Sequence, residues 1–146
     1  MAGDLKFTIK VEDNSKLVLN AEEKAIENAL YAMGIKAVEG SVDAISGKYG
    51  IPKAVDTGRL RASISFITPT DSGDSGEANT HSKAGDKLTG TAEKNSVVVG
   101  SNVEYADYVH NGTSRMAGRP FLRVGIEQTK GEMERQVTTI LKGGTI

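Results

Sequence analysis

The sequence predicts an α+β fold in which a long N-terminal helix and a C-terminal helix pack on a small, mainly antiparallel sheet, with a short helix between a strand and the last helix. Apolar and polar residues alternate over 5–11, which is typical of a half-buried strand. Apolar residues recur at steps of three and four over 20–47 and 120–141, as in amphipathic helices. Residues 96–101 form a β-branched run typical of a buried strand. A chain of 146 residues suits one core, so we treat residues 1–146 as a single domain.

The first predicted strand occupies residues 5–11, whose side chains alternate between the two faces of the sheet. Residues 12–15 are polar and typical of a turn. Residues 16–19 either form a second strand or lead directly into the first helix. The apolar side chains of the first strand are Leu5, Phe7, Ile9 and Val11.

A long helix is predicted to begin near Asn20 and to end at Gly47. Asn20 can accept a hydrogen bond from the first turn, and Glu23 follows three residues later, as in a capping box. Roughly 26 residues at 1.5 Å each give a length of ~39 Å, so we expect half or more of this helix to lie on another subunit. Gly34 and Gly40 allow a neighbouring backbone to approach closely. The apolar face consists of Ile26, Ala29, Leu30, Met33, Ala37, Val38, Ala44 and Ile45.

The segment 56–64 predicts one helical turn that leads into a strand. Asp56 or Thr57 can cap the turn, which carries Leu60 inward. Residues 63–67 then predict a strand, which ends before Pro69 because proline cannot donate a hydrogen bond to a sheet.

Residues 70–95 are rich in Gly, Ser, Thr, Asp and Lys, and Leu88 is their only large aliphatic residue. Such a segment buries too little apolar surface to offset the entropy lost on ordering. We therefore expect a flexible hairpin arm at about 70–95, joining two paired strands at their tip.

After the arm, residues 96–101 predict a strand buried on both faces. Tyr105, Tyr108 and Val109 have the spacing of a short helix, and Gly112 supplies its left-handed end.

Residues 114–119 predict a second flexible connection, after which Pro120 suits the first turn of the last helix. Gly143 and Gly144 end that helix. Its apolar face consists of Leu122, Ile126, Met133, Val137, Ile140 and Leu141.

The composition argues against several classes of protein. A formal charge of -1 gives no general attraction to nucleic acid or to an anionic membrane. The chain has no cysteine, which excludes disulfides and thiolate metal sites. It has no apolar run of ~18 residues and no recognisable signal peptide, so we expect a soluble cytosolic product.

Glu104, Asp107 and His110 are spaced three apart and could converge on one metal ion, as in a small metal-dependent hydrolase. A solvated helix face explains the same spacing equally well. A serine triad is not predicted, because no nucleophile-elbow glycine pattern surrounds any serine.

A group of arginines provides another interpretation, a nucleic-acid-binding module or a surface for an acidic partner. Ordinary solvated arginines explain the same residues. The group consists of Arg59, Arg61, Arg115, Arg119 and Arg123.

Taken in order, these motifs resemble the tail-component (morphogenesis) family of the Hong Kong 97 type of tailed bacteriophage. The family has a long helix, an Asp-Thr-Gly-x-Leu-Arg-x-Ser-Ile block, a Tyr-Ala-x-x-Val-Glu-x-Gly-Thr block and a Pro-Phe-Leu block before a last helix. Residues 16–142 follow this order, with His110 at the acidic position and Pro52 farther from the first block than the family's proline. The matching residues are Asp56, Thr57, Gly58, Leu60, Arg61, Ser63, Ile64, Tyr105, Ala106, Val109, Gly112, Thr113, Pro120, Phe121 and Leu122.

The resemblance implies a structural virion protein that is not an enzyme and needs no cofactor or metal. It implies a homo-oligomeric ring, a hexamer or a dodecamer, at the neck or head-tail junction. The implied partners are further copies of the chain and neighbouring neck, tail-terminator or tail-tube proteins. DNA would pass through the ring without specific recognition, and no membrane would be involved. The expected location is the virion, after assembly in the host cytoplasm.

The same resemblance implies structural roles for the motif residues. Tyr105 and Tyr108 would pack the short helix on the sheet. Gly58 and Gly112 would permit tight turns, with Gly112 aiming the final helix. Phe121 would anchor that helix, and His110 would occupy a variable surface position.

Overall fold

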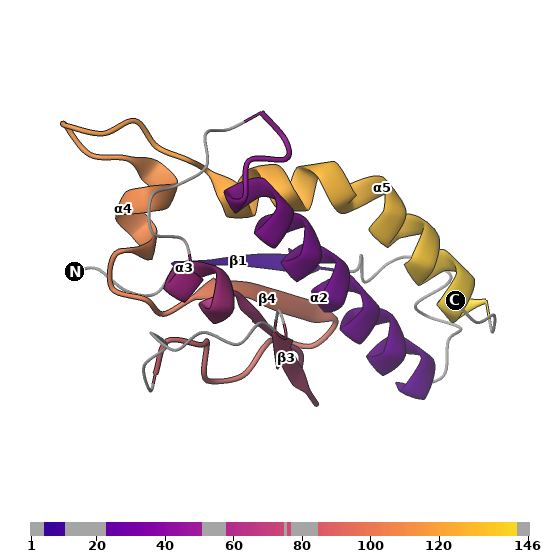
Figure 1. The fold of residues 1–146 in the computed structure, drawn as a ribbon. Helices are drawn as coiled ribbons and strands as arrows, with labels where there is room; N and C mark the ends of the chain where they lie inside the picture. Colours follow the sequence, from indigo (N-terminus) through magenta and orange to yellow (C-terminus); the bar gives the residue numbers. More distant parts are fainter. Residues whose placement is uncertain (1–4, 11–22, 51–57, 75, 77–84, 143–146) are drawn as a thin grey trace.

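The computed structural model describes residues 5–10, 23–50, 58–74, 76 and 85–142. The α+β prediction is confirmed, with helices packed on a four-stranded antiparallel sheet (Figure 1). The elements in chain order are β1 (Leu5–Lys10), α2 (Glu23–Ile45), α3 (Gly58–Ser63), β2 (Ser65–Ile67), β3 (Ser72–Asp74), β4 (Ser96–Ser101), α4 (Ala106–Asn111) and α5 (Phe121–Leu141). Some predicted features lie outside the described residues, namely Val11, the turn at 12–15, the segment 16–19, Asn20, Asp56, Thr57 and the stop at Gly143 and Gly144.

β4 lies inside the sheet, whose strand order is β1-β4-β2-β3 with every neighbouring pair antiparallel. Val99 of β4 stands opposite Phe7 of β1 on one side and Phe66 of β2 on the other. Val97 and Val99 are fully buried, whereas Val98 is half-buried. The prediction of a strand buried on both faces is therefore confirmed except at Val98.

β2 and β4 pair directly, so the segment between them joins two paired strands, as predicted. β3 lies within that segment and was not predicted, because Ser-Gly-Asp carries no strand pattern. Tertiary packing explains it. A Cβ atom on Gly73 would lie 2.5 Å from the Phe66 ring, so only a glycine lets β3 lie this close to the aromatic side chain.

Part of the predicted arm is bound to the domain. The backbone N–H of Asn102 donates to the carbonyl of Asp86 (2.8 Å), and the N–H of Leu88 donates to Ser65 Oγ (2.9 Å). The Asn102 side-chain amide also donates to the carbonyl of Lys87 (3.3 Å). Residues 86–88 therefore lie against β2 and the end of β4, while the flexibility of the arm as a whole stays a prediction.

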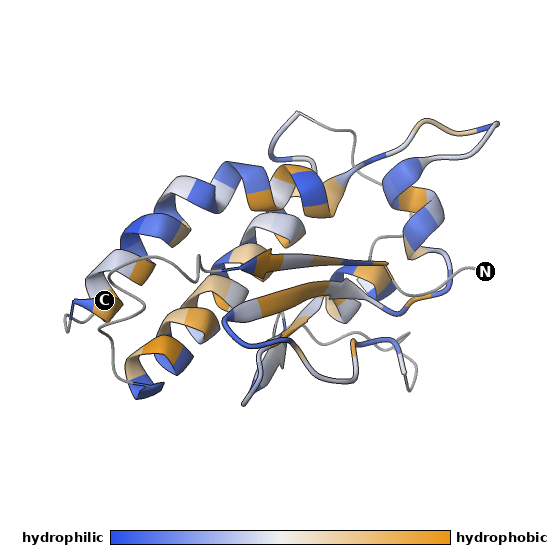
Figure 2. Cartoon of the chain, turned by 180° about the vertical axis from the view of Figure 1, so that it is seen from behind, coloured by the Kyte–Doolittle hydropathy of each residue, from blue (hydrophilic) through white to orange (hydrophobic). Residues whose placement is uncertain are grey.

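α2 covers one face of the sheet, and α5 runs antiparallel beside α2 (Figures 1 and 2). An ion pair between Lys36 of α2 and Glu132 of α5 (3.3 Å) joins the two helices on their solvent side. Burial along α2 extends from Ala29 to Ile45. Because α5 of the same chain packs along α2, the length of this helix does not by itself require another subunit, and a contact of α2 with a second copy stays a prediction.

Two glycines of α2 lie where other parts of the chain approach the helix closely. A Cβ atom on Gly40 would lie 2.5 Å from the carbonyl oxygen of Gly125 in α5, which confirms the predicted backbone approach. Gly34 instead faces the Phe66 ring, 2.2 Å from a hypothetical Cβ. The helix ends as predicted, because Gly47 has φ +98° and Lys48 N–H closes the turn on the carbonyl of Asp43 (3.0 Å).

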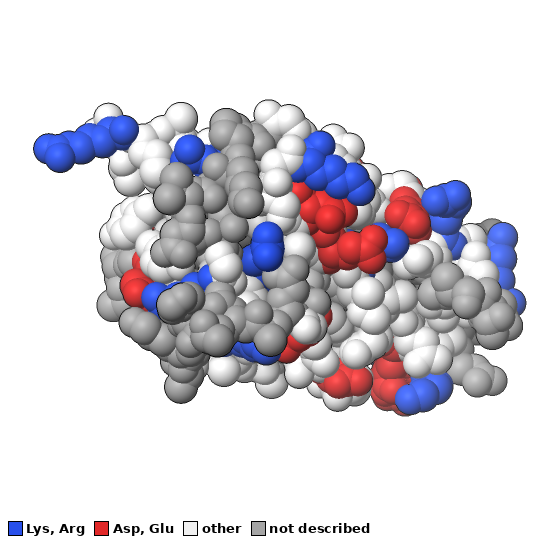
Figure 3. All heavy atoms as spheres, viewed as in Figure 1, with Lys and Arg blue, Asp and Glu red and all other residues white. Residues whose placement is uncertain are grey.

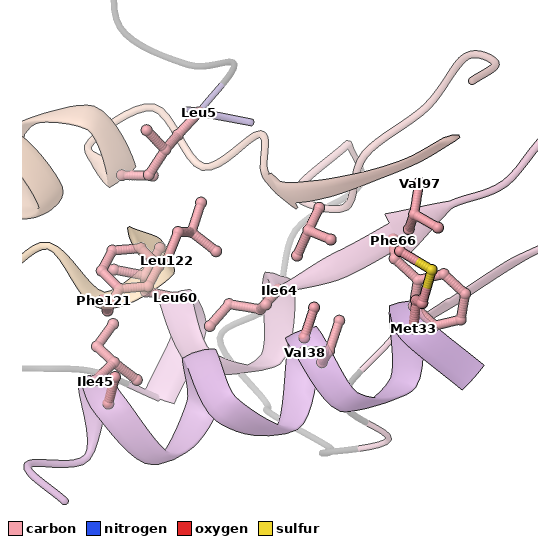
Figure 4. Packing of buried hydrophobic residues seen from close by; sticks show 14 of the residues in the cluster. Leu5, Met33, Val38, Ile45, Leu60, Ile64, Phe66, Val97, Phe121 and Leu122 are labelled. Carbon is pink, nitrogen blue, oxygen red and sulfur yellow. The ribbon is translucent and has the colours of Figure 1, made fainter. Parts of the chain in front are cut away.

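The core lies between α2 and the sheet, and α3 and the start of α5 close one end of it (Figure 4). Apolar residues cluster on β1, β4 and the sheet-facing sides of the helices (Figure 2). Within the described ranges, no helix is both long and apolar enough to cross a membrane. The labelled core side chains are Leu5, Met33, Val38, Ile45, Leu60, Ile64, Phe66, Val97, Phe121 and Leu122.

Candidate functional site

The motif blocks, far apart in sequence, meet at one end of the core. We call this the motif cluster; it comprises α3, residues 101–113 and residues 119–123. Leu60 and Ile64 of α3 belong to the same hydrophobic cluster as Phe121 and Leu122 of α5 (Figure 4). Ala106 is fully buried in it, and Tyr105 and Val109 are half-buried against it. The cluster anchors α5, as predicted for Phe121. Tyr108, by contrast, is 47% exposed, so it does not pack α4 on the sheet as expected.

Ser63 links α3 to the end of β4 through a buried hydroxyl pair. Its Oγ donates to the carbonyl of Leu60 (2.5 Å), and it lies 2.6 Å from Ser101 Oγ. Because Ser63 has only one hydroxyl hydrogen, Ser101 must donate to Ser63. Ser101 Oγ in turn accepts from the N–H of Val103 (3.1 Å). The motif serine therefore satisfies a helix end and fixes the chain where it leaves the sheet.

Arg59 joins three segments of the chain. Its Nε and Nη2 donate to the two carboxylate oxygens of Asp86 (2.9 and 2.8 Å), and Nη1 and Nη2 donate to those of Glu104 (both 2.9 Å). The guanidinium carbon lies 5.5 Å from the centre of the Tyr105 ring, within the range of cation–π attraction. The hydrogen bonds to Asp86 raise the pKa of Arg59 most, and those to Glu104 raise it further.

Burial differs sharply between the two carboxylates. The side chains of Arg59 and Asp86 are 12% and 7% exposed, whereas that of Glu104 is 62% exposed. The bidentate pair with Asp86 is thus largely removed from water, and the pair with Glu104 is at the surface. Arg61 lies half-buried nearby and donates to Ser46 Oγ (3.4 Å). Sequence reasoning missed Asp86, because nothing in the polar segment marks it.

His110 is buried, at 3% exposure, which contradicts the expectation of a surface position. Its ring lies between Phe7 and Phe121, with ring centres 5.4 and 5.3 Å away. Nε2 accepts from the backbone N–H of Arg123 (3.3 Å), so the proton is on Nδ1, which donates to Asn111 Oδ1 (3.1 Å). Burial above all lowers the pKa of His110, and the positive charge of Arg123 lowers it further.

The imidazole therefore caps α5 from another helix. Pro120, at the N-cap position, supplies no side-chain hydrogen bond, and the first turn of a helix has N–H groups without helical partners. A sequence signal for this burial exists. Val103, Ala106 and His110 stand at i, i+3 and i+7, and all three are buried.

The predicted metal ligands do not converge. Glu104 binds Arg59, Asp107 Oδ1 accepts from Asn111 Nδ2 (2.5 Å), and the imidazole of His110 is enclosed by aromatic rings. Over the described part of the chain, no group of three or more His, Asp or Glu side chains is arranged to hold a metal ion. The three residues thus have structural partners.

The structure gives the five arginines different surroundings. Arg59 is engaged by two carboxylates, Arg115 lies at an exposed loop, and Arg123 projects from the first turn of α5. Figure 3 shows Lys and Arg interspersed with Asp and Glu on the face it presents, without a continuous basic area. This distribution gives a nucleic-acid interface no specific support.

Gly112 begins the loop that leads from α4 to α5. Its φ of +83° and the bond from its N–H to the carbonyl of Tyr108 (2.8 Å) end α4, as the sequence predicted. The far end of the loop lies back against α4, where the N–H of Arg119 donates to the carbonyl of Val109 (2.7 Å). Gly58 begins α3, and the residues before it, where the expected tight turn would form, lie outside the described part of the chain.

Comparison of this chain with protein-family models, with curated proteins and with solved structures gave no match in any of the three. No known protein therefore assigns a role to the motif cluster, and the resemblance to a phage family stays a prediction from the sequence motifs.

Proposed function

We propose that this chain is a structural virion protein of a tailed bacteriophage or prophage particle, a protomer of a ring at the neck that completes the tail and joins it to the head. One observation carries the proposal: the ordered blocks that resemble the phage family fold into a single cluster. The resemblance supplies the identity of the particle. The cluster supports a mechanical role for those blocks.

The polar groups of the motif cluster support architecture over chemistry. Ser63 closes a helix end, and His110 caps α5. Arg59 of α3 ties Asp86 to the turn that precedes α4. An imidazole held between two phenyl rings with both nitrogens hydrogen-bonded is poorly placed to exchange protons with a substrate. Neither a metal-dependent hydrolase nor a nucleic-acid-binding module gains a specific observation in its favour.

The expected partners follow from the proposal. Further copies of the chain would form the ring, and neck, tail-terminator or tail-tube proteins would contact its two faces. DNA would pass through the opening without base-specific recognition. The length of α2 no longer argues for assembly, so the argument for self-association shifts to exposed apolar side chains. These are Tyr31 and Ile35 on α2, Tyr108 on α4 and Met116 in the loop that follows α4.

Two measurements test this function. Electron microscopy of the purified protein, alone and with a neck partner, should show closed rings of one diameter. Deletion of the gene should leave separate heads and tails that fail to join. Normal particles from the deletion strain, together with a protein that is monomeric at every concentration, would contradict the proposal.

A further inference from the structure

The loop between α4 and α5, residues 112–119, projects from the domain (Figure 1) and has a defined shape. We call it the tip loop. At its end, the N–H of Thr113 donates to the carbonyl of Met116 (2.8 Å), and the N–H of Met116 donates back to the carbonyl of Thr113 (3.3 Å). The N–H of Arg115 donates to Thr113 Oγ1 (3.2 Å). The sequence predicted a flexible connection here, whereas the structure has a hydrogen-bonded turn.

The base of the tip loop is closed by two glycines. A Cβ atom on Gly112 would lie 2.6 Å from the nitrogen of Gly118, and one on Gly118 would lie 2.7 Å from the carbonyl carbon of Asn111. The two arms of the loop thus touch backbone to backbone. A segment held in this way loses little entropy when it binds, which favours recognition.

The tip loop presents an apolar side chain beside a charged one. Met116 is 36% exposed, and Arg115 next to it is also exposed. Tyr108 on the adjoining helix is 47% exposed. Methionine adapts its shape to an apolar groove, and arginine can bind a carboxylate at the rim. The fitting partner is an apolar groove with an acidic edge.

The other end of the same molecule has such a groove. It has a volume of about 370 Å³ and lies at the N-terminal end of α2; we call it the α2 groove. Ile26, Leu30 and Pro69 give it an apolar lining. Two glutamates, Glu23 and Glu27, line it against one lysine. Its charge and polarity therefore complement those of the tip loop.

The two features lie at opposite ends of the domain: α4 and the tip loop at one end, the start of α2 at the other (Figure 1). A copy therefore cannot fill its own groove. Contact between two different surfaces of identical chains is heterologous, and it generates a ring when the rotation closes. We propose that the tip loop of one copy docks in the α2 groove of the next, with Met116 over Ile26 and Leu30 and Arg115 at Glu23. This inference rests on the proposed ring function and names its repeating contact.

Cysteine cross-linking tests the contact directly, because the chain has no cysteine of its own. Met116→Cys and Ile26→Cys are made in separate chains, mixed and oxidised. We expect a disulfide dimer from the mixture and little from either variant alone. Lys130→Cys, at an exposed position on α5, is the matched control and should give no dimer with Met116→Cys.

Reversing the charges at the contact provides the second test, in which light scattering measures the mass of the oligomer. Arg115→Glu should dissociate the oligomer, as should Glu23→Arg combined with Glu27→Arg. Mixing the two reversed chains should restore an oligomer in which they alternate, because every contact between unlike chains again joins opposite charges, with the signs reversed at one contact and original at the other. Arg115 and Glu23 are exposed, so Arg115→Glu and Glu23→Arg should keep the unfolding curve of the original chain. Glu27 is half-buried and pairs with Lys24 (3.7 Å), so the unfolding curve of the double variant is measured beside its mass.

The outcomes separate the inference from the proposed function. Rings that form without the Met116–Ile26 cross-link, or that keep their mass with Arg115→Glu, would overturn this contact and leave the ring intact. A chain that neither cross-links nor assembles at any concentration would overturn both.

Discussion

Gly40 of α2 and Gly125 of α5 bring the two longest helices into backbone contact. A Cβ atom on Gly40 would lie 2.5 Å from the carbonyl oxygen of Gly125, and one on Gly125 would lie 2.6 Å from the carbonyl carbon of Gly40. Ser41 and Thr129 flank the contact, and each returns its hydroxyl to its own helix, onto the carbonyls of Ala37 and Gly125 (2.8 Å each). Both hydroxyls therefore have a partner where the helices touch.

Gly125→Ala should destabilise the protein. The added methyl group would push against the backbone of Ser41, 2.5 Å away, and neither helix can yield without losing contacts along its length. We expect a loss of about 1–3 kcal/mol in the free energy of unfolding, measured by chemical denaturation.

Gly131→Ala is the matched control for that change. Gly131 lies in the same helix, and a Cβ atom there would meet nothing within 4 Å. The alanine should stabilise the protein by up to ~1 kcal/mol through helix propensity alone. Equal effects of both substitutions would show that the helices do not cross at Gly125.

His110 should make stability depend on pH. Its folded pKa lies below the ordinary value of 6.5, so the unfolded chain binds a proton that the folded chain excludes. Stability is therefore full above about pH 6.5 and falls as pH drops through that value, at most by about 1.4 kcal/mol per pH unit. Protonation also removes the acceptor that binds the N–H of Arg123.

Denaturation curves between pH 5.5 and 7.5 measure this effect, in a window above the titration of ordinary carboxylates. His110→Gln offers an amide oxygen that does not titrate. Its stability should be lower than that of the original chain at pH 7.5 and nearly constant across the window. A slope that survives the substitution would assign the pH dependence to another group.

Asp86 should contribute more to stability than Glu104, although both bind Arg59 through two hydrogen bonds. Asp86→Ala leaves a largely buried guanidinium with one exposed partner, and we expect a loss of about 1.5–3 kcal/mol. Glu104→Ala removes a surface pair and should cost about 0–1 kcal/mol. Arg59→Lys cannot reproduce the fork and should resemble Asp86→Ala. Equal losses from the two carboxylates would contradict the burial difference.

Ser63 and Ser101 should act as one unit. Ser63→Ala leaves the carbonyl of Leu60 without its donor, and Ser101→Ala leaves the N–H of Val103 without its acceptor; each should cost about 1–3 kcal/mol. Because the hydroxyls are 2.6 Å apart, the double substitution should cost less than the sum of the two. Additive losses, measured by the same denaturation assay, would show that the pair is not coupled.

The sequence alone determined the elements whose side chains repeat locally. Period-two alternation placed β1, period-3.6 spacing placed α2 and α5, and Gly47 and Gly112 marked two helix ends. These features depend on residues within a turn or two of one another, so they can be read without knowing the fold.

The tertiary structure decided which distant groups meet. β3 exists because Gly73 fits over Phe66, Asp86 matters because the chain brings it to Arg59, and His110 is buried because β1 and α5 close around it. Spacing in the sequence suggested a ligand set for His110, but packing gave it an aromatic enclosure and a capping role. Pairings across many residues depend on chain closure and on burial from all sides, and neither leaves a local pattern.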